Sequence, residues 1–334
     1  MVLFLIATFG ITILLTRVIM AFARAYDVVD KPNVPRKKHT IPMPLLGGLG
    51  IMGGFWVMLG GALLGGFIIL PGKYVVALLG ATALLGYAGY RDDRFDMSSR
   101  YQLLSIIGAA LWATLILQIN VAVSIPWGGM AVLSAGMSAL VTFIWLTGIT
   151  LVTKILDGLD GLVTGIAAIG GFGIAAFSLA TPYFDKQVAM VAAVFAASCL
   201  GFLVWNYKPA QIFLGNGGST WAGFMLAFLA LIGGIKFAIA MLVLALPSID
   251  LVYVMIKRLK NGKKPWEGDD SHLHFRLKNY LGDEKTVWVY YGVALLMSLS
   301  TLFLSSPQKY ALLGVLAVLS VLMVVFVEKW VQKA

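Results

Sequence analysis

The sequence predicts an all-α polytopic membrane protein with about eleven transmembrane helices, and two features of its composition lead to this prediction. Hydrophobic residues make up 60% of the 334 residues and charged residues 12%, whereas a typical soluble domain has about 25% charged residues. The mean hydropathy is +0.91. The single cysteine, Cys199, lies in an apolar run, which excludes a disulfide within one chain. We therefore expect one transmembrane domain over residues 1–334.

Apolar segments long enough to cross a bilayer, which takes about 20 residues, recur along the whole chain. The first has neither a basic n-region nor a small-residue cleavage site, so we expect a retained span rather than a removed signal peptide. The segment 121–130 is expected to form a small hairpin on the outer surface. The expected spans are residues 2–22, 46–68, 74–90, 101–120, 134–153, 161–181, 187–205, 219–232, 234–256, 286–304 and 310–327.

The distribution of lysine and arginine predicts the orientation of these spans. Cytoplasmic connections are enriched in Lys and Arg, and 20 of the 25 lie in alternate connections and the C-terminal tail. These connections are residues 23–45, 91–100, 154–160, 206–218 and 257–285. We therefore expect the N-terminus outside, the C-terminus in the cytoplasm and the active face cytoplasmic. The same bias accounts for the net charge of +10 without nucleic acid as a partner.

Two carboxylates, Asp157 and Asp160, lie between two long apolar segments. A charge at the centre of a span costs about 2.5–3.5 kcal/mol, so acids beside hydrocarbon usually have a function. If the segment is helical, residues three apart share one face. The alternative is that they cap a helix end. Asp250, which follows Pro247 near the inner end of a span, is expected to be functional or paired with a basic neighbour such as Lys257.

A second acidic pair, Asp92 and Asp93, follows the third span. Adjacent carboxylates can bind a divalent cation, or one of them can have a raised pKa and act as a base. The alternative is that these acids are neutralised by the neighbouring arginines, which are Arg91, Arg94 and Arg100.

Three further polar clusters lie in the predicted cytoplasmic connections. The basic cluster with Arg36, Lys37 and His39 can bind phosphates or attract anionic lipid. The run from Gly215 to Ser219 can present backbone N–H groups to a phosphate at a helix N-terminus, or it can be a flexible turn with Ser219 as N-cap.

His272 and His274 form the third cluster. They are predicted to contact a phosphate or nucleotide rather than a metal, because a metal needs more ligands than two histidines and no cysteine lies near them. A solvated loop is the alternative.

The order of these motifs resembles one family. Asp30-x-Pro-Asn is followed by Asp92-Asp93, by Asp157-Gly-Leu-Asp160-Gly-Leu, by Asn206-x-x-Pro-Ala, by Gly215-x-x-Gly-Ser, by Pro247-x-x-Asp and by His272-x-His with Arg276-Leu277. The pattern is similar to that of the polyprenyl-phosphate N-acetylhexosamine-1-phosphate transferases, which include WecA/TagO-like enzymes and the more distant MraY translocases. It covers about residues 1–300.

The resemblance implies a membrane phosphoglycosyl transferase. Such enzymes move a sugar 1-phosphate from a UDP-sugar to polyprenyl phosphate and release UMP, with Mg²⁺ or alternatively Mn²⁺ as cofactor. They lie in the bilayer of the plasma (inner) membrane as multi-pass proteins, and a homodimer is the candidate assembly by analogy.

The resemblance also implies roles for individual residues. Asp92 and Asp93 would deprotonate or position the acceptor phosphate, and Asp157 and Asp160 would line the nucleotide pocket. His272, His274 and Arg276 would bind the pyrophosphate or the uridine. Further substrate-binding candidates are Lys154, Arg36, Lys37, His39 and Asn206, and the metal-ligand candidates are Asn216, Asp92 and Asp93.

Several positions differ from the family pattern. Asn216 stands where the family has an aspartate that binds Mg²⁺, and an amide is a poorer ligand than a carboxylate. Gln102 stands near an expected lysine, Lys154 at an expected asparagine, Leu45 at an arginine and Phe275 at a histidine. A catalytically impaired relative that binds nucleotide-sugar or lipid phosphate, or partners another membrane enzyme, is therefore the alternative. A transporter is disfavoured, because the ionisable residues gather at one face.

Overall fold

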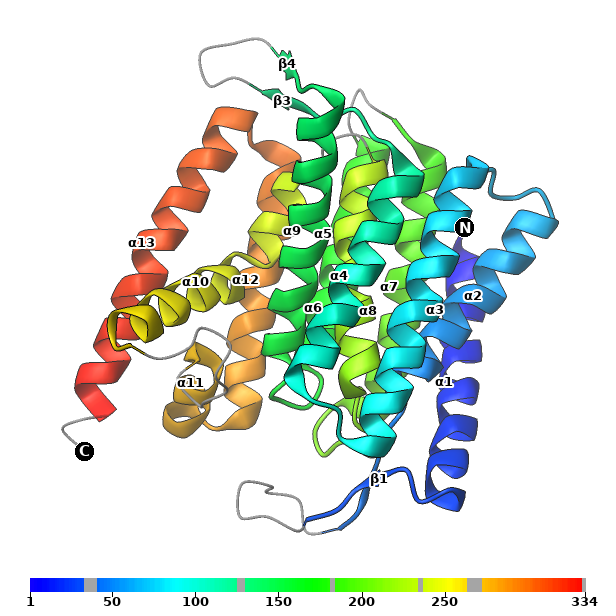
Figure 1. Cartoon of the computed structure of the whole chain (residues 1–334), viewed down its shortest axis with the longest axis horizontal. Helices are drawn as coiled ribbons and strands as arrows, with labels where there is room; N and C mark the ends of the chain where they lie inside the picture. The colour runs from blue at the N-terminus through cyan, green and yellow to red at the C-terminus, as the bar shows by residue number, and fades with distance from the viewer. Residues whose placement is uncertain (33–40, 125–129, 181–183, 234–236, 263–271, 332–334) are drawn as a thin grey trace.

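The computed structural model describes residues 1–32, 41–124, 130–180, 184–233, 237–262 and 272–331 (Figure 1). Among these residues, eight helices are long and apolar enough to cross a membrane. They are α1 (Val2–Ala25), α2 (Gly47–Leu64), α3 (Gly72–Phe95), α4 (Ser99–Leu117), α5 (Ala135–Leu156), α6 (Leu162–Ala180), α7 (Lys186–Asn206) and α12 (Asp283–Phe303). The chain is a multi-pass, all-α membrane protein, as predicted.

Helix α8 (Gly215–Ile232) occupies the centre of the bundle. All its residues from Gly217 to Ile232 are buried, and it packs against α2, α3, α5, α6, α7 and α9. A helix that is apolar all round is stable only where neighbours cover every side. Helix α13 (Ser306–Val331) contains a shorter apolar stretch, Pro307–Met323. The count of eleven spans is not confirmed.

The predicted span 234–256 is wrong in its form, because within its described part the structure has two helices. Helix α9 (Phe237–Val243) ends before Leu244, and α10 (Ala245–Lys260) runs across the direction of the long helices (Figure 1). Pro247 explains the break. It has no N–H to donate to the Val243 carbonyl, and its ring would clash with that carbonyl in a continuous helix. In the first turn of a new helix this missing donor has no cost.

Short elements complete the fold at the two ends of the bundle. Strands β3 (Ala122–Ser124) and β4 (Met130–Val132) pair antiparallel, so the predicted hairpin at 121–130 is confirmed in its described part. It lies at the end opposite to strand β1 (Figure 1). The other end carries the antiparallel pair of β1 (Val29–Asp30) and β2 (Met43–Pro44), and also helix α11 (Leu273–Leu281).

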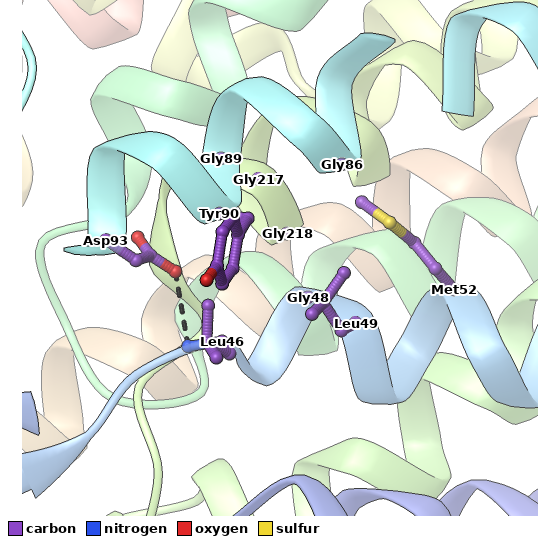
Figure 2. Close-up of a pocket in the computed structure, with 10 residues that line it drawn as sticks. All are labelled: Leu46, Gly48, Leu49, Met52, Gly86, Gly89, Tyr90, Asp93, Gly217 and Gly218. Carbon is purple, nitrogen blue, oxygen red and sulfur yellow. Dashed lines mark hydrogen bonds between the residues drawn. The ribbon is translucent and has the colours of Figure 1, made fainter. Parts of the chain in front are cut away.

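Glycines let the backbones of α2, α3 and α8 touch. A Cβ added to Gly89 would lie 2.2 Å from the Gly217 Cα, and one added to Gly48 would lie 2.4 Å from the Gly218 nitrogen. Small residues at helix crossings permit this close approach. Figure 2 shows these glycines along the crossing, with Asp93 at its open end. The crossing therefore places the end of α3 beside the N-terminus of α8.

Candidate active site

Asp93 is bound by backbone N–H groups of two other elements. Its Oδ2 accepts a hydrogen bond from the Leu46 nitrogen at 3.2 Å (Figure 2), and its Oδ1 accepts one from the Asn216 nitrogen at 3.3 Å. Gly215, which begins α8, has a φ of +74°, and a Cβ there would lie 2.4 Å from Asp93 Oδ2. An anion at a helix N-terminus is favoured by the helix dipole. Here the acid that lies at the start of α8 is the side chain of Asp93, from the end of α3.

Ser219 does not cap α8. The helix begins four residues earlier, at Gly215, and the Ser219 hydroxyl donates back to the Gly215 carbonyl at 3.2 Å. The N-cap alternative is therefore wrong. In the structure, the Asn216 N–H of this run donates to Asp93. The predicted contact between the run and a phosphate remains a prediction.

Asp92 faces away from Asp93, toward α4. Its Oδ1 accepts hydrogen bonds from the Met97 nitrogen at 3.0 Å and from Gln102 Nε2 at 2.7 Å. Lys154, in the last turn of α5, donates to Gln102 Oε1. The chain Lys154–Gln102–Asp92 thus joins α5, α4 and α3. Within the described part of the chain, no donor reaches Asp92 Oδ2.

Asp157 and Asp160 lie in the turn between α5 and α6, so the expectation of a shared helix face is wrong. Helix α5 ends at Leu156, and Gly161 has a φ of +77°, which a side chain would strain. Asp160 Oδ2 accepts a hydrogen bond from the Ala210 nitrogen at 3.2 Å. The loop that precedes α8 therefore holds the Asp160 side chain by a backbone hydrogen bond.

The environment of Asp157 favours its neutral form. Burial by the surrounding protein raises the pKa of Asp157 to about 7; a hydrogen bond with Ser219 opposes the shift, and the charges of Asp93 and Asp160 add to it. The residue still exposes surface to solvent. Burial likewise raises the pKa of Asp160, against the hydrogen bond from Ala210 and the charges of Lys208 and Lys278.

Asn206 joins the two loops that surround these acids. Its Oδ1 accepts hydrogen bonds from the Gly161 nitrogen at 3.1 Å and from Thr164 Oγ1 at 2.9 Å, and its Nδ2 donates to the Ile212 carbonyl at 3.0 Å. The side chain is buried. Its contacts hold the turn after α5 against the loop before α8, which is a structural role. The predicted substrate contact of Asn206 remains a prediction.

The two histidines lie against the turn that carries Asp157 and Asp160. A Cβ on Gly158 would lie 2.8 Å from His274 Nε2, and the His272 and His274 rings stack 5.9 Å apart. Burial, with smaller contributions from the charges of His272 and Lys278, lowers the pKa of His274 to about 3. His274 is therefore neutral at pH 7. The structure brings the two sequence motifs together, although more than a hundred residues separate them.

Asp250 has His272 as its partner, not the predicted Lys257. Asp250 Oδ2 lies 2.9 Å from His272 Nδ1, and Oδ1 accepts a hydrogen bond from the Leu273 nitrogen at 2.9 Å. Both side chains are buried. A buried carboxylate that bonds one ring nitrogen orients the imidazole and leaves the other nitrogen for a further contact.

The remaining predicted residues are placed as follows. Arg276 lies half-buried in α11, whereas Arg36, Lys37 and His39 lie outside the described residues. Sequence reasoning gave Gln102 and Ser219 no part of their own in the site. Neither residue type carries a charge, and only the contact with an aspartate reveals their part.

The oxygen ligands that Mg²⁺ prefers are present at the start of α8. In the described ranges, no group of three or more His, Cys, Asp or Glu side chains could hold a metal by itself. Mg²⁺, however, usually keeps several waters and needs only one or two carboxylates beside substrate phosphates. Asp93 and Asp157 are close enough for their charges to interact, and Asn216 adjoins Asp93. A magnesium ion at these residues remains a prediction.

Comparisons with known proteins agree with this site. A family model described as glycosyl transferase family 4 matches residues 75–234, which span most of the acidic residues above. A probable undecaprenyl-phosphate N-acetylglucosaminyl 1-phosphate transferase of Bacillus subtilis is 29% identical over 95% of this chain and 88% of its own. An undecaprenyl-phosphate α-N-acetylglucosaminyl 1-phosphate transferase of Thermotoga maritima is 28% identical over 86% of each chain.

A phospho-N-acetylmuramoyl-pentapeptide-transferase of Halalkalibacterium halodurans is 25% identical over 90% of this chain and 96% of its own. The fold and the site thus define a multi-pass membrane protein with an acidic centre between helix ends. The chain is similar to the polyprenyl-phosphate N-acetylhexosamine-1-phosphate transferases, and the predicted resemblance to that family is confirmed.

Proposed function

We propose that this protein transfers a sugar 1-phosphate, that of an N-acetylhexosamine, from a UDP-sugar to polyprenyl phosphate at the cytoplasmic face of the plasma membrane. The observation that carries the proposal is the convergence of Asp92, Asp93, Asp157 and Asp160 on one end of the bundle, in a chain that is similar over 95% of its length to an N-acetylglucosaminyl 1-phosphate transferase. A phosphate oxygen of the lipid attacks the sugar-linked phosphorus of the donor. The bond from that phosphorus to the bridging oxygen breaks, and UMP leaves.

Asp92 is better suited than Asp93 to contact the acceptor phosphate. Both oxygens of Asp93 accept backbone hydrogen bonds, whereas Asp92 Oδ2 receives none from the described residues. A phosphate monoester has a second pKa of about 6. The monoanionic lipid phosphate can therefore give its proton to a carboxylate as the phosphate attacks. In this proposal Asp92 Oδ2 accepts that proton, and Asp93 positions the N-terminus of α8.

Asp157 and Asp160 face the nucleotide side of the proposed reaction. The buried His274 touches the turn between them, and its neutral imidazole adds no charge there. Asp93, Asp157 and the Asn216 amide would hold Mg²⁺, which would offset the negative charge of the diphosphate and of the departing UMP. The neutral Asn216 favours the second candidate, an impaired relative that binds substrates without turnover.

Transfer of labelled sugar phosphate from UDP-GlcNAc to undecaprenyl phosphate tests the proposal, with the purified full-length protein and Mg²⁺. Turnover that Asp92→Ala abolishes is the expected result. No turnover in the unaltered chain, with recovery in Asn216→Asp, would support the impaired relative whose site is intact. No turnover in either would refute this transferase activity.

A further inference from the structure

We propose that Lys154 binds a substrate phosphate, and that Gln102 holds the ammonium apart from Asp92 so that both charged groups can act on substrate. This inference rests on the proposed function and deepens it. The geometry is a chain of three side chains from three helices: Lys154 donates to Gln102 Oε1, and Gln102 Nε2 donates to Asp92 Oδ1 at 2.7 Å.

The two charged partners fix the orientation of the Gln102 amide. An ammonium can only donate and an ionised carboxylate can only accept. The amide oxygen must therefore face Lys154 and the amide nitrogen must face Asp92. The same nitrogen also lies 3.3 Å from the Met97 carbonyl, which accepts from it. A turned amide would lose all three contacts, so Gln102 is a rigid spacer between the two charges.

The spacer leaves hydrogen-bonding capacity on each side. The ammonium has three N–H donors, and in the described part of the chain Gln102 is its one hydrogen-bond partner. Asp92 likewise keeps Oδ2 open to a ligand, since both its donors, Met97 N and Gln102 Nε2, go to Oδ1. Lys154, Gln102 and Asp92 are each half-buried, so a ligand in the site can reach them. A direct ion pair would instead occupy both charged groups.

A phosphate is the ligand that this arrangement suits. Asp92, Asp93, Asp157 and Asp160 are all acids, so the site needs a cation to accept further negative charge. Two lysines near Asp160 donate to another carboxylate: Lys208 lies 2.6 Å and Lys278 lies 3.2 Å from Asp283 oxygens. Lys154 has no such carboxylate partner in the described ranges. An ammonium with donors to spare makes charge-assisted hydrogen bonds to a phosphate.

The test compares Lys154→Gln with Lys154→Arg in the full-length protein. Hydrogen bonds to charged groups predict that Lys154→Gln raises the KM of the phosphate-bearing substrate about 10- to 100-fold, with Lys154→Arg much closer to the unaltered protein. A rise for polyprenyl phosphate alone assigns the acceptor phosphate, and a rise for UDP-GlcNAc alone assigns the donor diphosphate. Unchanged KM values for both substrates overturn the proposal, whatever happens to kcat.

A matched control and a spacer variant sharpen the test. Lys73→Gln removes a lysine that donates to the Leu117 carbonyl at 2.8 Å, outside the site, and should change neither KM. Gln102→Leu lets Lys154 pair with Asp92, so it should raise the same KM as Lys154→Gln while the melting temperature stays within a few degrees. An unchanged KM in Gln102→Leu would refute the positioning role of Gln102.

Failure of the proposed function is distinguishable from failure of this inference. If the unaltered protein shows no transfer, the proposed function fails. Binding of UDP-GlcNAc and of polyprenyl phosphate, measured by calorimetry on the unaltered protein and the same four variants, then gives Kd values in place of KM. A Kd that rises in Lys154→Gln and not in Lys73→Gln supports the phosphate contact, and equal Kd values in all of them overturn it.

Discussion

The two acidic pairs of the site differ in how the chain holds them. Asp92 and Asp93 are neighbours in the last turn of a helix, yet one bonds α4 and the other bonds the N-terminus of α8. Asp157 and Asp160 lie in a turn that a hydrogen bond to the Asn206 amide holds in place. The charge of Asp160 raises the pKa of Asp157. The adjacent acids thus bond two different helices, whereas both acids of the second pair bond α8 or the loop just before it, Asp157 through Ser219 and Asp160 through the Ala210 nitrogen. Spacing in sequence does not decide which carboxylates act together.

The largest effect should come from Asp92→Asn. If Asp92 accepts the proton of the acceptor phosphate, kcat should fall about 10²- to 10⁴-fold. The melting temperature should hardly change, because the amide oxygen can still accept from Met97 and Gln102. Initial rates and thermal unfolding measure the two quantities. If Asp92→Asn keeps its activity, Asp92 does not accept the proton, and the proposed difference in role between Asp92 and Asp93 is wrong.

Asp93→Ala should lower stability as well as activity. The change leaves the N–H groups of Leu46 and Asn216 without an acceptor, and each unsatisfied buried donor costs about 1–3 kcal/mol. Denaturation in detergent should therefore separate Asp93→Ala from Asp92→Ala, which loses bonds at a more exposed helix end. Equal stabilities would show that Asp93 does not hold α3 against α8.

The glycine crossing below Asp93 offers a smaller test of the same contact. Gly89→Ala would place a methyl group 2.2 Å from the Gly217 Cα, and overpacking of this kind costs about 1–3 kcal/mol. Gly86→Ala on the same helix is the matched control, because its new methyl group would meet the flexible Met52 sulfur at 3.3 Å. Unfolding of both variants should show a loss confined to Gly89→Ala. A loss of the same size in both would indicate helix propensity or general packing as the cause.

The smallest effect concerns pH and the turn of the second acidic pair. The pKa of His274 is lowered to about 3 in the folded protein, from 6.5. The unfolded chain therefore binds the proton more readily, and stability falls as pH drops below about 6.5, by roughly 2 kcal/mol at pH 5. His274→Gln should show a shallower pH dependence in thermal unfolding. Parallel curves would mean that the pKa of His274 is the same in the folded and in the unfolded protein.

The sequence was a good guide to the membrane fold, but a poor guide to the partners of the side chains that it predicted for the site. Hydropathy located the long helices, because burial in lipid requires apolar residues. It missed the break before α10, since the apolar run 237–246 continues across it and only Pro247 marks the change. The partners of Asp92 and Asp250 depend on residues from other helices. A single sequence holds no signal for such contacts.

Because α2, α3 and α8 meet backbone to backbone at Gly48, Gly89, Gly217 and Gly218, the crossing leaves little room for one helix to shift against another. The larger side chains of Met52 and Tyr90 lie beside these glycines. The opposite wall, where α11 meets Gly158 through the rings of His274 and Phe275, consists of side-chain contacts that can rearrange. If the proposed function holds, the side chains of the α11 wall are a part of the site that can adjust to sugars of different size.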